Sequence, residues 1–292
     1  GGIGRVLNPP LDEKLILGLE IGASQLGMLA IPGIQYLGYL HNAIDQLRGE
    51  ACSLQFFSQG QFQNPMVVRI ASYAYQKGFG GHFHNDNSIA ALRDIPGLIL
   101  ASPSNGRDAV LMLRTCVAAA KINGAVSVFL EPIALYMTKD LHEERDGLWC
   151  SEYPSFEEHI AIGESKTWTE GTDCTIFSYA NGLWMSLRVA KRLEEEGISC
   201  RVVDIRWLNP LPEESILREA TATGRVLVVD ECRKTGGMAE PILALLAERS
   251  TGLKLKRIAG QDSYIPLGDA ANRVLVQEED IEQAIKDLME MK

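Results

Sequence analysis

The chain has 292 residues, of which 46% are hydrophobic and 23% are charged, a composition that excludes a disordered protein and allows a large core. With 28 Lys and Arg against 38 Asp and Glu, the net charge of -10 argues against sequence-independent binding of nucleic acid. Its six cysteines are too widely spaced for a zinc ribbon, and no apolar run is long enough to span a membrane. We therefore expect a cytoplasmic or organelle-matrix protein.

The first predicted element is a helix that begins near Glu13. Between Leu15 and Ile31 the only charged side chain is Glu20, so we expect this helix to be buried. A carboxyl at the entrance to a dry interior keeps its proton more readily and can share it with a base. Alternatively, Asp12 and Glu13 only complement the positive end of a helix that follows two prolines.

Strand-like apolar runs alternate with helical patterns through the rest of the first half. Buried strands are predicted over 66–70, 97–100 and 126–130, with a helix over 108–120 between the last two. This alternation is typical of a parallel sheet covered by helices on both faces.

The loop from Gly78 to Ser88 contains several glycines and two of the five histidines, His82 and His84. Glycines let a backbone approach a ligand closely. With Asp86, the two histidines could form the first ligand set of a metallohydrolase, because alternate residues of an extended strand point to the same side. Alternatively, both rings only donate hydrogen bonds to loop carbonyls.

Charged and aromatic residues replace the regular periodicity between 136 and 170, where we place the connection between two domains. A second alternating series then predicts strands over 174–177, 201–205 and 225–229. It also predicts a helix that stops at Gly197, one that begins near 212, and a closing helix over 279–289. The sequence thus predicts two three-layer α/β domains, residues 1–150 and 171–292, joined by a linker over 151–170.

A series of motifs runs in order along almost the whole chain. In the first half they are Pro10-Leu11-x-Glu13, Ala43-Ile44-Asp45-Gln46, Pro65 to Arg69, His84, Pro96-Gly97-Leu98 and Val128 to Glu131; in the second half they are Val203 to Pro210 and Asp230 to Gly237. The first half resembles the pyrimidine-binding domain, and the second half the transketolase-like C-terminal domain, of the beta subunit of 2-oxo-acid dehydrogenases. That subunit belongs to the thiamine-diphosphate-dependent first component of the pyruvate and branched-chain complexes.

The resemblance implies a cofactor-binding and catalytic role for Glu13. In the family the matching glutamate hydrogen-bonds the aminopyrimidine of thiamine diphosphate and stabilises the imino tautomer, whose exocyclic nitrogen removes the proton from the thiazolium carbon. The resemblance also implies that the ring of Tyr39 packs on the pyrimidine. For Tyr39, ordinary packing is the alternative explanation.

His84 matches the family's active-site histidine, which stabilises and protonates intermediates while the acyl group passes to a lipoyl arm. The spacing to Pro96 favours His84, whereas the spacing from Arg69 favours His82, because the intervening loop carries extra residues. We therefore take His84 as the first choice and His82 as the second.

The family's motif for the diphosphate and its metal is missing, since no Asn-Asn pair follows Gly268-Asp269-Ala270. The resemblance therefore implies that thiamine diphosphate is shared with an alpha partner, which holds Mg²⁺. It also implies an α2β2 assembly that serves a lipoyl acyltransferase core. The family's initial strand and helix are absent ahead of Gly1, and Gly33 replaces an acid of many relatives. We therefore expect an incomplete first domain, from a branch in which alpha and beta regions form one polypeptide.

Other interpretations remain open from the sequence. The chain could be a fragment of another thiamine-diphosphate enzyme, of the transketolase or deoxyxylulose-phosphate synthase type. It could be the metallohydrolase built on His82, His84 and Asp86, or a subunit that serves assembly alone. Which 2-oxo acid is used depends on a few pocket positions shared with the partner, and the sequence does not identify it.

Overall fold

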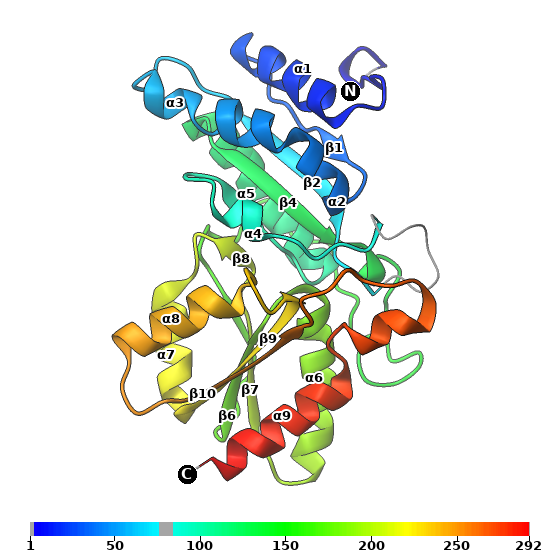
Figure 1. Ribbon diagram of the computed structural model, residues 1–292, viewed down its shortest axis with the longest axis vertical. Helices are drawn as coiled ribbons and strands as arrows, with labels where there is room; N and C mark the ends of the chain where they lie inside the picture. Colours follow the sequence, from blue (N-terminus) through cyan, green and yellow to red (C-terminus); the bar gives the residue numbers. More distant parts are fainter. Residues whose placement is uncertain (1–2, 76–83, 292) are drawn as a thin grey trace.

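The computed structural model describes residues 3–75 and 84–291, which form two sheets, one above the other along the long axis (Figure 1). The upper sheet has the order β1-β2-β4-β3-β8, with β1 at Gly33–Ile34, β2 at Met66–Ser72, β3 at Ile99–Ala101, β4 at Val126–Pro132 and β8 at Trp207–Asn209. The lower sheet has the order β10-β9-β6-β7-β5, with β5 at Lys166–Thr169, β6 at Cys174–Ser178, β7 at Cys200–Asp204, β9 at Arg225–Arg233 and β10 at Lys254–Gly260. Neighbours in both sheets are parallel, except that β8 and β5 pair antiparallel with β3 and β7.

Helices cover both sheets. The upper half carries η1 (Ile3–Arg5), α1 (Glu13–Gln25), α2 (Leu37–Leu40), η2 (His41–Ala43), η3 (Gln46–Ala51), α3 (Leu54–Phe57), α4 (Ala90–Arg93), α5 (Gly106–Asn123) and η5 (Ile133–Leu135). The lower half carries α6 (Ala180–Glu195), α7 (Glu213–Thr223), α8 (Ala239–Arg249), η6 (Gly268–Arg273) and α9 (Glu278–Glu290). The predicted α/β class, the predicted strands, and the predicted helix over 108–120 and those of the second half are confirmed.

The upper sheet is buried on both faces, which is why its strands are continuous apolar runs. Alternate residues of β2 point to opposite sides, so Val68 belongs to the core cluster that includes Leu17 of α1, whereas Val67 belongs to the cluster that includes Met112 of α5. The arrangement has three layers, with α1, α2 and η3 on one face and α5 on the other. The carboxyl end of β1 leads into α2, which carries Tyr39, and His84 opens the second described stretch, 84–291, which follows β2 in the chain.

The helix predicted in the apolar segment 15–31 begins at Glu13 as expected, but it is not buried as expected and covers only part of that segment. Asp12 caps α1 by accepting hydrogen bonds from the N–H groups of Lys14 and Leu15, but the helix ends at Gln25. It ends there because Gly27 adopts a left-handed conformation, with φ of +82°. Of its residues only Leu17 and Ser24 are buried, whereas Leu15 and Leu19 are 39% and 47% exposed in this chain.

The two halves meet through buried polar contacts. Arg206 donates two hydrogen bonds to Asp108 of α5, at 2.9 and 3.0 Å, and Ser104 accepts one from the N–H of Ala180 at 2.8 Å. Burial, followed by the charge of Asp108, raises the pKa of nearby Asp204 to about 7. Since strand β8 of the second half also completes the first sheet, the halves are closely joined.

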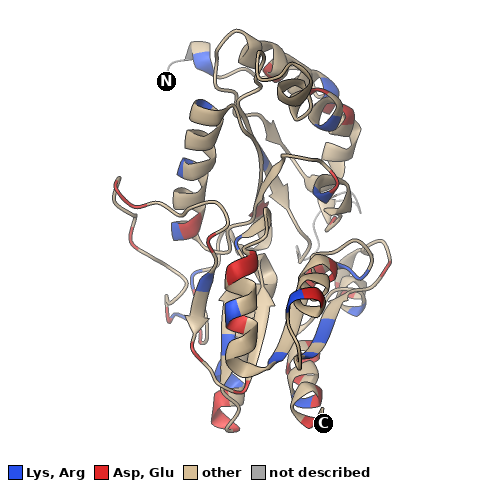
Figure 2. Cartoon of the chain, turned by 90° about the vertical axis from the view of Figure 1, so that its left-hand side faces the viewer, with Lys and Arg blue, Asp and Glu red and all other residues tan. Residues whose placement is uncertain are grey.

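The helices of the lower half contain both acidic and basic residues (Figure 2). Glu278 of α9 accepts hydrogen bonds from both Arg188 and Arg192 of α6, at 2.7 and 2.6 Å. Such ion pairs link α6 to α9 and place opposite charges next to each other, so this face is neither uniformly acidic nor uniformly basic. Within 3–75 and 84–291, no helix combines the length and the apolar composition needed to cross a bilayer.

Candidate active site

Glu13 lies in the first turn of α1 and is half-buried. One carboxylate oxygen, Oε2, accepts a hydrogen bond from Nδ2 of Asn42 at 3.2 Å. Asp12 supplies the helix cap by itself, through its contacts with the backbone of the first turn. The carboxylate of Glu13 is therefore turned toward the η2 segment.

Tyr39, three residues before Asn42 in the chain, contacts His84. The hydroxyl of Tyr39 lies 3.2 Å from Nε2 of His84, and their ring centroids are 5.6 Å apart. The ring of Tyr36 contacts the same imidazole edge to face, with centroids 4.5 Å apart. Burial and the neighbouring Tyr39 raise the pKa of Tyr36.

The α2–η2 turn brings these predicted residues together. Tyr39 near the end of α2 contacts His84, and Asn42 in η2, three residues later, contacts Glu13. Sequence reasoning missed Tyr36 and Asn42, although Tyr36, Tyr39 and Asn42 are spaced by three, which places them on one side of a short helical turn. An acid, an imidazole and two aromatic rings fit the flat, hydrogen-bonding aminopyrimidine of thiamine diphosphate.

The metal ligand set proposed from His82, His84 and Asp86 does not form among the described residues. His82 lies outside them, and Asp86 is instead bound to Arg233 at 3.0 Å and to the N–H of Ser88 at 3.0 Å. In the parts of the chain that the structure covers, no group of three or more His, Cys, Asp and Glu side chains could hold a metal ion. Gly268-Asp269-Ala270 opens the short helix η6.

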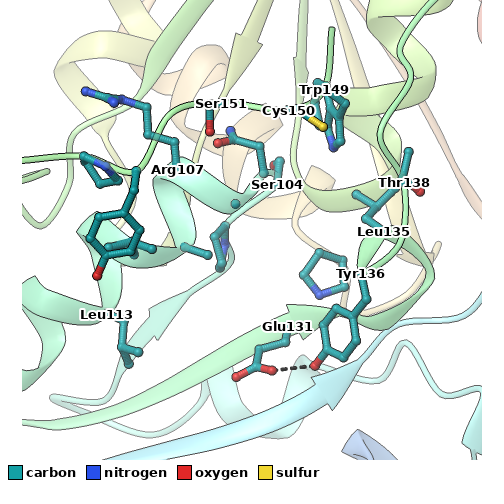
Figure 3. Close-up of a pocket in the computed structure, with 18 of the residues that line it drawn as sticks. Ser104, Arg107, Leu113, Glu131, Leu135, Tyr136, Thr138, Trp149, Cys150 and Ser151 are labelled. Atoms are coloured by element: carbon teal, nitrogen blue, oxygen red, sulfur yellow. Dashed lines mark hydrogen bonds between the residues drawn. The ribbon is translucent and has the colours of Figure 1, made fainter. Parts of the chain in front are cut away.

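A cavity of about 640 Å³ lies on the opposite face of the upper sheet, against α5 (Figure 3). Its wall includes Glu131, whose carboxylate binds Arg69 at 2.7 Å and accepts a hydrogen bond from Tyr136 at 2.5 Å. Burial, followed by this hydrogen bond, raises the pKa of Tyr136. Since Glu13, Tyr39 and His84 do not line it, the cavity is separate from the site described above.

Comparison with known proteins supports the sequence resemblance. Residues 163–281 match the family model described as "Transketolase, C-terminal domain". The chain is 30% identical to the 2-oxoisovalerate dehydrogenase subunit beta of Bacillus subtilis, over 99% of this chain and 85% of that protein. It is 31% identical to the pyruvate dehydrogenase E1 component subunit beta of Staphylococcus epidermidis, over the same shares.

A solved structure gives the same fold. The chain aligns with a "Split gene transketolase, inactive beta4 tetramer" with a TM-score of 0.75 and 20% identity, over 99% of this chain and 85% of that one. At this identity the likeness concerns the architecture alone. It confirms the predicted transketolase-like arrangement of two α/β units.

Proposed function

The chain belongs to the family of beta subunits of thiamine-diphosphate-dependent 2-oxo-acid dehydrogenases, and we propose that Glu13, Tyr39 and His84 form its half of the active site. It is the beta component of an enzyme that oxidatively decarboxylates a 2-oxo acid, pyruvate or branched-chain, and transfers the acyl group to a lipoyl group. The observation that carries the proposal is the convergence of Glu13 and His84 on the α2–η2 turn.

Each residue has a proposed role. Glu13 hydrogen-bonds the aminopyrimidine ring of the cofactor, for which a carboxyl near an apolar interior is suited. Tyr39 packs against that ring and holds His84, while His84 stabilises and protonates groups during acyl transfer. The bound cofactor supplies the carbanion chemistry, which none of the twenty side chains can provide.

The cofactor is shared with an alpha partner, in our proposal. The described residues offer rings and a carboxyl for the pyrimidine, but no metal-binding group for Mg²⁺ and its diphosphate. We place Mg²⁺ in the alpha partner, or in an alpha region of the same enzyme, within an α2β2 assembly that acylates a lipoyl acyltransferase core. The division into residues 1–150, 151–170 and 171–292 also remains a proposal, although β5 of the lower sheet falls in the proposed linker.

The outer face of α1 supports a partner on this side of the molecule. Leu15 and Leu19 are 39% and 47% exposed. At Gly18 and Gly22 no atom lies within 4 Å of the position where a Cβ would stand. A ridge of leucines beside open glycines permits close packing of a second helix or sheet, so we propose that the alpha partner covers this face next to Glu13.

The family assignment favours the dehydrogenase over the alternatives. Relatives that align over 99% of the chain are beta subunits of 2-oxo-acid dehydrogenases, and Asp86 of the metallohydrolase interpretation is held by an arginine. The transketolase-type fragment would also need a basic set for phosphorylated sugars, for which the sequence offers no motif.

Binding of thiamine diphosphate tests the divided site. The partner is obtained by co-purification with the tagged chain from the native source and identified by its mass. With Mg²⁺ present, calorimetric titration should show negligible binding to the chain alone and saturable binding to the complex. Tight binding to the lone chain would contradict the divided site, and a complex that neither binds the cofactor nor decarboxylates any 2-oxo acid would contradict the function.

A further inference from the structure

Asp86 lies at a junction of three segments. Its Oδ1 binds Nη2 of Arg233 in β9 at 3.0 Å and accepts the N–H of Ser88 at 3.0 Å. Its Oδ2 lies 3.7 Å from Nε2 of His41 in η2. The side chain is only 15% exposed, and Arg233 is fixed further by donating from Nε to the carbonyl of Ser263 at 3.1 Å.

The residues that follow Asp86 lie against the C-terminal half over several contacts. Asn87 donates from Nδ2 to the carbonyl of Glu231, and Nη1 of Arg93 donates to the carbonyls of Gly236 and Gly237, each at 2.6 Å. A Cβ at Gly236 would lie 2.7 Å from Cβ of Ala90, so the backbones approach too closely for a side chain there. The segment 84–93 is therefore seated on the β9–α8 connection.

Both proposed site residues, Glu13 and His84, are connected to Asp86 through neighbouring residues. His84 precedes Asp86 by two residues in the seated segment. His41 is adjacent to Asn42, whose Nδ2 donates to Glu13. A displacement of the Asp86 carboxylate would thus change the position of His84 relative to Glu13.

We infer that Asp86 and Arg233 act as a positioning pair, through which the C-terminal half fixes the spacing between Glu13 and His84. The inference rests on the proposed function of those two residues, but it concerns contacts within this chain. Burial acts to raise the pKa of Asp86, yet the contacts with His41 and Arg233 outweigh it and lower the pKa, so the carboxylate is charged at neutral pH. A charged carboxylate shared by a guanidinium and an imidazole restricts all three segments.

Kinetics of the reconstituted enzyme give the first test. Asp86→Asn keeps the shape and removes the charge, and Arg233→Met keeps the stem and removes the guanidinium. Each should lower kcat about tenfold with KM changed less than twofold, because the reacting groups are misplaced while binding is retained. The double variant should lose no more than the worse single variant, since both act through one pair. Arg249→Gln, which removes an exposed arginine from α8, is the matched control and should keep kcat.

Chemical modification gives a readout that does not depend on activity. Diethyl pyrocarbonate acylates imidazoles at rates set by their exposure and environment, and mass spectrometry resolves each histidine. Asp86→Asn and Arg233→Met should change the rates at His41 and His84 at least threefold, while His142 and His159 serve as internal references.

The two tests distinguish the inference from the function on which it rests. A wild-type complex without 2-oxo-acid dehydrogenase activity would overturn the proposed function, and the modification rates would still decide the positioning pair. Unchanged rates at His41 and His84 in both variants would overturn the pair. The pair would also be overturned if the kcat losses of the two single variants multiplied in the double variant. It would be overturned as well if both single variants lowered the melting temperature, because loss of folded protein would then explain the lower kcat.

Discussion

Glu231 should make the stability of this protein fall as the pH rises. It is fully buried in β9, and burial raises its pKa to about 8, against 4.5 as the ordinary value. Its two oxygens accept hydrogen bonds from the backbone and the side chain of Asn181, at 2.9 and 2.8 Å, which offset the burial only in part. The neighbouring charge of Asp230 raises the pKa further.

The sign follows from proton binding. Between pH 4.5 and about 8, the folded protein holds a proton on Glu231 that the unfolded chain has released. The contribution of this bound proton to the free energy of unfolding is therefore fully present below the pKa of Glu231 in the unfolded chain, and it is lost as the pH rises through the pKa in the folded protein. Each pH unit corresponds to about 1.4 kcal/mol, so the free energy of unfolding should fall by about 2–3 kcal/mol between pH 6 and pH 8 from this group.

Urea unfolding at pH 6, 7 and 8, followed by tryptophan fluorescence, measures this effect. Glu231→Gln cannot ionise, so the decrease between pH 6 and pH 8 should be smaller in this variant than in wild type by about 2–3 kcal/mol. Glu248→Gln, which changes an exposed glutamate of α8, is the matched control and should keep the wild-type dependence. An equal decrease in wild type and Glu231→Gln would refute the reasoning.

Three further predictions concern the core and the partner face. Asp108→Asn should cost about 3 kcal/mol of unfolding free energy, measured by denaturant titration, because a buried guanidinium loses its counter-charge. Gly171→Ala should lower stability by about 3 kcal/mol in the same assay, since the new Cβ would lie 2.2 Å from the carbonyl carbon of Cys200. Gly106→Ala, where no atom lies within 4 Å, should be close to neutral, and equal losses would contradict the steric argument. Gly22→Leu should weaken association with the alpha partner in sedimentation experiments at unchanged melting temperature; undiminished association would place the partner elsewhere.

The strands were predictable from the sequence because parallel strands buried on both faces are unbroken apolar runs. This held for β2, β4, β6 and β9, and helical periodicity likewise predicted α5. Strand β8 was not foreseen, since its pairing with β3 joins residues more than a hundred positions apart. The burial of α1 was not predicted correctly, because apolar composition does not show how much of a helix its own chain covers.

Motif resemblance predicted Glu13 and His84, and the structure places both against one turn. The pair of Asp86 and Arg233 could not be predicted, because the sequence offers no signal that links a loop of the first half to the end of β9. The proposed site residues were thus accessible from local patterns, whereas the proposed positioning pair depends on tertiary structure.

Replacement of Glu13 by Gln in the reconstituted enzyme tests the central claim most directly. Asp12→Asn is the matched control, because Asn caps a helix as well as Asp does and the two acids share one helix end. If Glu13 acts on the cofactor, Glu13→Gln should lower kcat at least about a hundredfold while the complex still forms, and Asp12→Asn should retain wild-type turnover. Equal and small effects of both substitutions would show that Glu13 only complements the helix end, and would contradict the account.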